Sequence, residues 1–141
     1  MTIQNHINSD MLAWLQDNNF KHTLANIKTD SGALNILYND KFCLKIYDRL
    51  GHRFGVTINV ANKYDETLYD NDSFSLYWSF KYFNIQETAS FSARTENQYT
   101  ENLPKLMTDL KNIIPHLNKL NPLEWENMED WISKEAKKQF T

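Results

Sequence analysis

Carboxylates and tyrosines alternate in one short polar stretch, and these residue types are the ones best suited to a chemical role. The stretch spans 61–72 and contains Tyr64, Asp65, Glu66, Tyr69, Asp70 and Asp72. Tyrosine offers a rigid contact area and carboxylates attract a basic partner, so the combination is typical of protein-binding surfaces. A solvated loop is the alternative, because clustered charges usually face water. A calcium loop fits less well, since the central glycine and the terminal glutamate of a helix–loop–helix site are missing.

The remaining reactive residue types do not form a catalytic or metal-binding motif. No zinc spacing relates the four histidines, His6, His22, His52 and His116. Cys43 could be a nucleophile, but without a glycine-rich elbow or an adjacent base a structural cysteine is the simpler interpretation. The three glycines, Gly32, Gly51 and Gly55, cannot build a phosphate-binding loop. We therefore expect a protein that is not an enzyme and has no catalytic residues, metal or cofactor.

Composition and charge narrow the class of protein further. The 141 residues are 41% hydrophobic and 23% charged, which is ordinary for one globular domain spanning 1–141. The net charge of −3 argues against a nucleic-acid partner, because phosphates require a basic surface. A single cysteine fits a reducing compartment, and no segment approaches the roughly 20 apolar residues of a membrane helix. The N-terminus lacks the pattern of a signal peptide. We expect a cytoplasmic protein without a membrane partner.

The elements that must position these residues begin with a two-hairpin antiparallel meander over 34–61. Apolar residues alternate with a period of two, which places each set on one face of a strand. The three sets are Leu34, Ile36 and Tyr38, then Phe42, Leu44 and Ile46, then Phe54, Val56, Ile58 and Val60. A three-residue loop 39–41 predicts pairing of Tyr38 with Phe42, and a three-residue loop 49–51 predicts pairing of Ile46 with Phe54. One apolar face would then cross all three strands.

Helices are predicted before and after the meander in the chain. An amphipathic pattern predicts a helix over 2–17, and 20–28 is either a short strand or an ordered loop. The segment 73–83 alternates strictly like a strand, yet its good N-cap residues and its all-round apolar character suit a buried helix. We expect a loop over 85–99, and then a helix capped by Asn102 that kinks or ends near Ile114, because Pro115 cannot donate a hydrogen bond. Asn121 and Glu124 form a capping box for a last helix. The fold class is therefore α+β, with an N-terminal helix, a three- or four-stranded meander and two C-terminal helices packed on the sheet.

A family resemblance rests on the meander itself. Residues 38–60 read YNDKFCLKIYDRLGHRFGVTINV. This pattern resembles small bacterial immunity proteins of polymorphic toxin and contact-dependent growth inhibition systems, in which a strand ends in an Asp-Arg-Gly-like turn. Here the turn is Asp48, Arg49 and Gly51, with Leu50 inserted. The resemblance favours a helix for 73–83. It implies an antitoxin that binds one cognate toxin domain and blocks its active site or an essential surface.

These observations lead to one main hypothesis and two alternatives. The main hypothesis is a stoichiometric inhibitor that neutralises a toxin, such as a basic nuclease, through protein–protein interaction with the acidic loop. One alternative is a small-ligand-binding domain or enzyme with a pocket between sheet and helices, lined by tryptophans: Trp14, Trp78, Trp125 or Trp131. The other is a secretion chaperone or adaptor that binds a protein through its helices.

Overall fold

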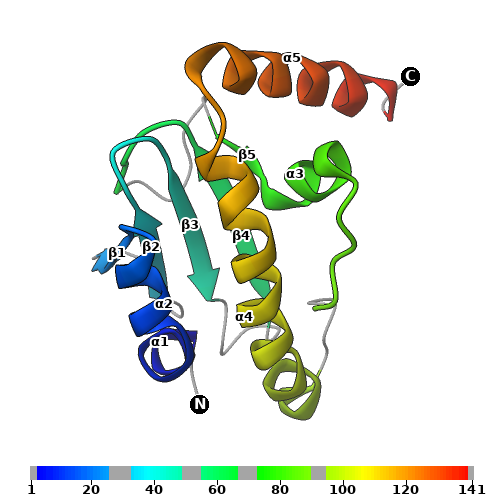
Figure 1. Cartoon of the computed structure of the whole chain (residues 1–141). Coiled ribbons are helices and arrows are strands. Elements are labelled where there is room, and N and C mark those ends of the chain that lie inside the picture. The colour runs from blue at the N-terminus through cyan, green and yellow to red at the C-terminus, as the bar shows by residue number, and fades with distance from the viewer. Residues whose placement is uncertain (1–2, 26–32, 49–54, 67–72, 90–94, 140–141) are drawn as a thin grey trace.

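The computed structural model describes residues 3–25, 33–48, 55–66, 73–89 and 95–139, and it has the expected α+β fold (Figure 1). An N-terminal helical segment leads into an antiparallel sheet, and further helices follow it. In chain order the elements are α1 (Ile3–His6), the π-helical turn η1 (Ile7–Met11), α2 (Leu12–Asp17), β1 (Lys21–Ala25), β2 (Ala33–Tyr38), β3 (Cys43–Asp48), β4 (Val56–Ala61), β5 (Phe74–Ser75), α3 (Leu76–Phe83), α4 (Glu96–Asn118) and α5 (Pro122–Lys138).

The sheet is a five-stranded meander in the order β1-β2-β3-β4-β5. It is wider than the three or four strands expected from the sequence, because both edges carry an added strand. The strand alternative for 20–28 is the correct one, since Lys21–Ala25 pairs along β2. At the other edge, the two residues of β5 pair with β4.

The predicted register of the first hairpin is wrong by one residue. Tyr38 pairs with Cys43 and Leu37 with Leu44, so the connecting loop has four residues, 39–42. The Asn39 side chain explains the longer turn, because its Oδ1 accepts hydrogen bonds from the backbone nitrogens of Lys41 (2.9 Å) and Phe42 (3.1 Å). Since side chains alternate with a period of two, this slip turns β2 over. Its residues Leu34, Ile36 and Tyr38 therefore lie with Cys43 and Ala61, in a small cluster separate from the main core.

The second hairpin keeps its predicted face although its register is also wrong. Ile46 pairs with Ile58 and Leu44 with Val60, which is four residues from the predicted partners Phe54 and Val56. A shift by an even number of residues leaves every side chain on its original face. The apolar residues of β3 and β4 accordingly share the main core. Phe54 and the predicted turn 49–51 lie outside the described residues.

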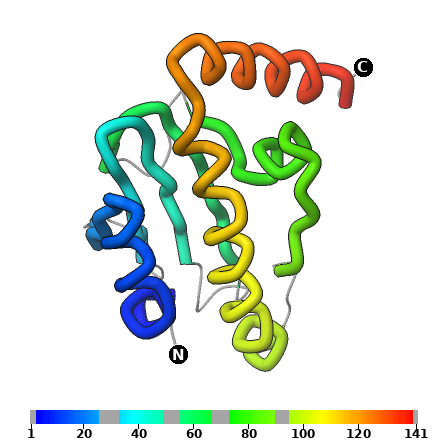
Figure 2. The backbone as a smooth tube through the Cα atoms, viewed as in Figure 1, coloured from blue at the N-terminus to red at the C-terminus, as the bar shows by residue number. Residues whose placement is uncertain are grey.

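The main core lies between this sheet face and the helices. Figure 2 shows α4 running alongside the strands and α5 turning across the end of α4. The helical stripe of α4 is fully buried, and Leu103, Leu106, Met107, Leu110, Ile113, Ile114 and Leu117 belong to the core cluster. Ile3, Ile7, Met11 and Leu15 from the N-terminal segment join it. The apolar stripes predicted for α4 and for the N-terminal helical segment are therefore buried in the core.

The ambiguous segment 73–83 is divided between the two predicted structures. Phe74 and Ser75 extend the sheet, and the helix α3 begins at Leu76, with Ser75 in extended conformation as its N-cap. The helix ends at Phe83, and its C-cap residue Asn84 adopts the left-handed conformation at φ 55°. Asparagine tolerates that conformation better than most residues. The helical alternative is therefore correct for most of the segment.

Helix α4 begins earlier than the sequence indicates and does not end near Ile114. Thr95 is the N-cap, since its side chain accepts from Gln98 N, so 96–99 are helical and not loop. The helix continues through Pro115 to Asn118. Buried residues on both sides of the proline, Ile114 and Leu117, offset the lost hydrogen bond by packing in the core. Helix α5 starts with the predicted capping box between Asn121 and Glu124.

Candidate binding surface around the β2–β3 turn

The acidic stretch singled out in the sequence is described only as far as Glu66. Tyr64 is 38% exposed, its ring lies 4.4 Å from that of Tyr38, and its hydroxyl donates to Glu66 Oε1 at 2.6 Å. This hydrogen bond stabilises the protonated phenol and raises the pKa of Tyr64 to about 12. Tyr64 and Glu66 therefore form a fixed, exposed pair beside β2. Tyr69, Asp70 and Asp72 lie outside the described residues.

Asp65 points back toward the sheet. Its carboxylate lies 3.5 Å from Nζ of Lys45, whose side chain is fully buried in the middle of β3. A buried ammonium requires a charged partner, because desolvation disfavours an isolated charge. Lys45 is itself the sequence signal for this pair, because it is the one charged residue between Cys43 and Tyr47. Asp65 thus anchors the loop on the sheet.

The β2–β3 turn, residues 39–42, is fastened to the end of α4. Asn39 Nδ2 donates to Asn118 Oδ1, and Lys41 Nζ donates to the Asn118 carbonyl, both at 2.9 Å. Together with the hydrogen bonds inside the turn, these contacts hold the exposed Asp40 on a fixed backbone. A preorganised loop of this kind binds a partner with little loss of conformational entropy.

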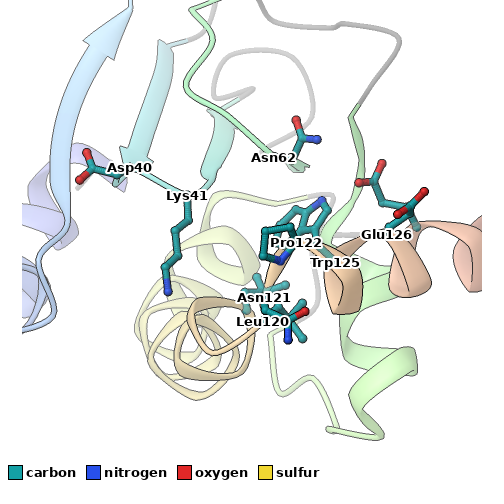
Figure 3. Close-up of a pocket in the computed structure, with 10 residues that line it drawn as sticks. Asp40, Lys41, Asn62, Leu120, Asn121, Pro122, Trp125 and Glu126 are labelled. Atoms are coloured by element: carbon teal, nitrogen blue, oxygen red, sulfur yellow. The ribbon is translucent and has the colours of Figure 1, made fainter.

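Two clefts flank this turn. The first, which we call the α5 cleft, has a volume of about 670 Å³ and separates the turn from α5. Figure 3 shows Asp40 and Lys41 on one side, Trp125 and Glu126 on the other, and Asn62 above them. Its apolar lining comes from Leu117, Leu120, Pro122 and Trp125, and its carboxylates are Asp40, Glu126 and Glu129.

The second cleft, the α2 cleft, lies on the opposite side of the turn and has a volume of about 650 Å³. Tyr38, Asp40 and Lys41 line it together with Asn18 and Asn19 at the end of α2. Asp40 and Lys41 border both clefts, so the turn forms a ridge between them. Because the Tyr38 ring also packs against the Tyr64 ring, the exposed Tyr64–Glu66 pair adjoins the same ridge.

Trp125 is the tryptophan of the α5 cleft. It is 8% exposed, and its ring packs near Phe42 and Phe74, with centroids 5.6 and 6.2 Å away. Its indole Nε1 is buried and has no hydrogen-bond partner among the described residues. An unsatisfied buried donor costs about 1–3 kcal/mol. The other tryptophans named as pocket candidates, Trp14, Trp78 and Trp131, are half-buried against the main core.

A smaller cavity of about 240 Å³ lies between β4, α3 and α4. Glu87 and Asp109 are at its wall, and burial together with the nearby Asp109 raises the pKa of Glu87. The Asp109 carboxylate already accepts hydrogen bonds from Thr88 N, Thr88 Oγ1 and Ala89 N. This cavity lies between sheet and helices, but none of the four tryptophans named for the ligand-binding alternative lines it, and its volume is below the 300–1,000 Å³ common for ligand sites. The α5 cleft, lined by Trp125, lies within that range of volumes.

Asp48 also has a structural role. It is 3% exposed and accepts a hydrogen bond from the Tyr99 hydroxyl at 2.7 Å, while Ile3 N lies 3.4 Å from the same oxygen. Burial and the bond to this carboxylate raise the pKa of Tyr99. The contact ties the end of β3 to the first turns of α1 and α4. Arg49, its neighbour in the Asp-Arg-Gly-like turn, lies outside the described residues.

Neither a metal centre nor a membrane span is found in the described ranges. No group of three or more His, Cys, Asp or Glu side chains there is placed to hold a metal ion. No helix in those ranges combines the length and apolar character that crossing a membrane requires. Comparison of the chain with protein-family models, with curated proteins and with solved structures finds no match.

Proposed function

We propose that this chain is an immunity protein, a stoichiometric inhibitor that binds a cognate toxin domain in the bacterial cytoplasm and neutralises it. The observation that supports the proposal is the ridge of the β2–β3 turn with its adjoining Tyr64–Glu66 pair. The exposed Asp40 stands there on a turn held by hydrogen bonds to α4, and beside it the Tyr64 hydroxyl donates to the exposed Glu66 carboxylate. Such a surface can contact another macromolecule without rearranging.

Charge complementarity indicates which kind of toxin domain would bind. Asp40, Glu66 and Glu126 are exposed carboxylates around the ridge. Three lysines, Lys21, Lys41 and Lys63, are exposed there too, and the chain as a whole carries a net charge of −3. A basic toxin domain, as a nuclease must be to bind phosphates, would be steered toward this surface. Blocking the toxin's basic substrate site would then be sufficient for inhibition.

Co-expression with the toxin domain encoded by the neighbouring reading frame tests the proposal. We expect the chain to restore growth of cells that express the toxin, and purified components to form a one-to-one complex with a dissociation constant below micromolar. A control chain with Lys substituted for both Asp40 and Glu66 should bind more weakly. If no neighbouring toxin exists, or if none binds more tightly than micromolar, the proposal is wrong.

Asp40 and Glu66 are better targets for mutation than Asp65. Asp65→Lys would place a second ammonium beside the buried Lys45, so a loss of binding could reflect a loss of folding. Asp40 and Glu66 are exposed, and replacing them leaves the Lys45–Asp65 contact intact. Circular dichroism and the midpoint of urea unfolding should be unchanged in the Asp40→Lys, Glu66→Lys chain, which separates binding from stability.

A further inference from the structure

We infer that the α5 cleft receives an extended cationic peptide segment of the protein that this chain inhibits. The inference rests on the proposed function, because the segment belongs to the toxin. It goes further by assigning a second contact beside the ridge and by naming the chemistry of the segment: a backbone carbonyl for Trp125 and an arginine or lysine side chain for the carboxylates.

The need for an acceptor comes from Trp125. Trp125 lines the cleft, and its Nε1 donor is buried beside it without an acceptor in the described part of the chain. Figure 3 places the indole nitrogen on the side of the ring toward Asn62. The Asn62 amide is exposed and offers both a donor and an acceptor. A peptide group presents the complementary acceptor and donor, so one peptide unit can bind both side chains.

The need for a cation comes from the carboxylates. Asp40 and Glu126 line the cleft from two sides, and Lys41, which keeps its positive charge while it donates to the Asn118 carbonyl, is the one lysine among the described lining residues. The two carboxylates outnumber this ammonium, so the lining attracts a further cation. The apolar lining residues Leu120 and Pro122 can cover the methylene stem of a long basic side chain. The guanidinium of arginine can also bind a carboxylate with two hydrogen bonds.

A peptide suits the site better than a small free cation, because the cleft is continuous with the ridge. Asp40 and Lys41 belong to the turn and line both the α5 cleft and the α2 cleft. A chain bound beside Trp125 would therefore continue over the turn that the proposed function already uses. Less than 1 Å² of the Nε1 atom is exposed, so binding must also shift the indole ring or the Asn62 side chain slightly.

Nuclear magnetic resonance of the ¹⁵N-labelled chain tests the inference through the indole N–H signals. The probes are two blocked synthetic peptides, acetyl-Gly-Arg-Gly-Arg-Gly-amide and the same sequence with Glu in place of Arg. Trp125→Phe assigns the Trp125 signal. We expect the Arg peptide to move this signal downfield, as hydrogen bonding does, while the signals of Trp14 and Trp131 stay in place. The Glu peptide should leave the Trp125 signal unmoved.

Two substitutions in α5 form a matched pair. Glu126 lines the cleft, whereas Asp130 is an exposed carboxylate of the same helix that does not. Glu126→Gln should lower the affinity for the Arg peptide about fivefold or more, and Asp130→Asn should change that affinity less than twofold. Equal effects of the two substitutions would mean that only the general charge of α5 matters, and would overturn the inference.

Other outcomes also decide against it. Binding of neither peptide would show that the cleft is not a peptide site, and equal binding of both would rule out recognition of a cation. If acetyl-arginine methylamide binds as tightly as the Arg peptide, the occupant is a small cation and not a peptide segment.

Toxin neutralisation by Glu126→Gln and Trp125→Phe distinguishes this inference from the proposed function. If the parent chain and both variants neutralise the toxin equally well, the proposed function stands and the cleft inference fails. If the parent chain neutralises no toxin, the proposed function fails, whatever the peptides do.

Discussion

At the scale of single residues, the buried contact between Asp48 and Tyr99 joins three elements. Tyr99→Phe removes only the hydroxyl, so the Asp48 carboxylate loses one of its hydrogen-bond donors while the ring remains packed. We expect the free energy of unfolding to fall by about 1.5–3 kcal/mol, the usual range for a hydrogen bond to a charged group. Urea unfolding measures the change, and Tyr77→Phe on the exposed face of α3 is the control. A loss no larger than that of the control would show that the bond contributes little.

The raised pKa of Glu87 leads us to expect that the stability of the fold depends on pH. Burial and the nearby Asp109 raise its folded pKa above 4.5, so the folded chain binds this proton more strongly than the unfolded chain. The free energy of unfolding should therefore decrease as the pH rises from 4.5 through the folded pKa. Glu87→Gln should raise the urea midpoint at pH 7 relative to the parent chain and leave it unchanged well below pH 4.5. Glu101→Gln, an exposed control, should have no such pH-dependent effect.

Tyr64 reports on the geometry of the acidic surface. Its hydrogen bond to Glu66 is the largest cause of the rise of its pKa from 10.0 to about 12. Glu66→Gln keeps an acceptor but removes the charge, so the pKa of Tyr64 should return toward 10.0. Ultraviolet titration of the phenolate, with Tyr64→Phe to identify the signal, measures the shift. An unchanged titration would mean that the pair does not form in solution.

At the scale of elements, the β2–β3 turn depends on Asn39. Its side chain accepts two hydrogen bonds from the turn and donates one to Asn118. Asn39→Ala removes all three, and we expect a loss of about 2 kcal/mol, since each such bond contributes about 1 kcal/mol or somewhat less here. Asp40→Ala is the matched control in the same turn and should stay within about 0.5 kcal/mol of the parent chain. If Asn39→Ala and Asp40→Ala lowered the free energy of unfolding equally, Asn39 would have no special role in the turn.

At the scale of the whole molecule, the exposed Asp40 and Glu66 lie at the end of the sheet where α4 finishes. If this end meets a basic toxin, Asp40→Lys with Glu66→Lys should slow association about tenfold at low salt and flatten its salt dependence. Glu96→Lys with Glu101→Lys makes the same charge change at the opposite end of α4 and should have a much smaller effect. Stopped-flow kinetics at two ionic strengths measures both. If both double variants slowed association equally, the net charge of the chain would explain the effect, and no defined binding surface would be needed.

Local patterns alone were sufficient for much of this fold. The stripes of α4 and α5, the capping box at Asn121 and the shared face of β3 and β4 follow from periodicity and from contacts within three or four residues. The pairing partners on β4 were wrong by an even number of residues, so the face survived. The amino-acid sequence by itself therefore determined the fold class and most of the apolar core.

Only the tertiary structure decided which polar residues became buried and which surface formed. One residue more in the β2–β3 loop turned β2 over, and the partners of Asp48 and Lys45 are 51 and 20 residues away along the chain. Such pairs leave no local period, because the reason for each is the desolvation of a charge by distant elements. The α5 cleft likewise joins a turn, the residue after β4 and a helix junction, so Trp125 could be named from the sequence as a pocket candidate, but its neighbours could not.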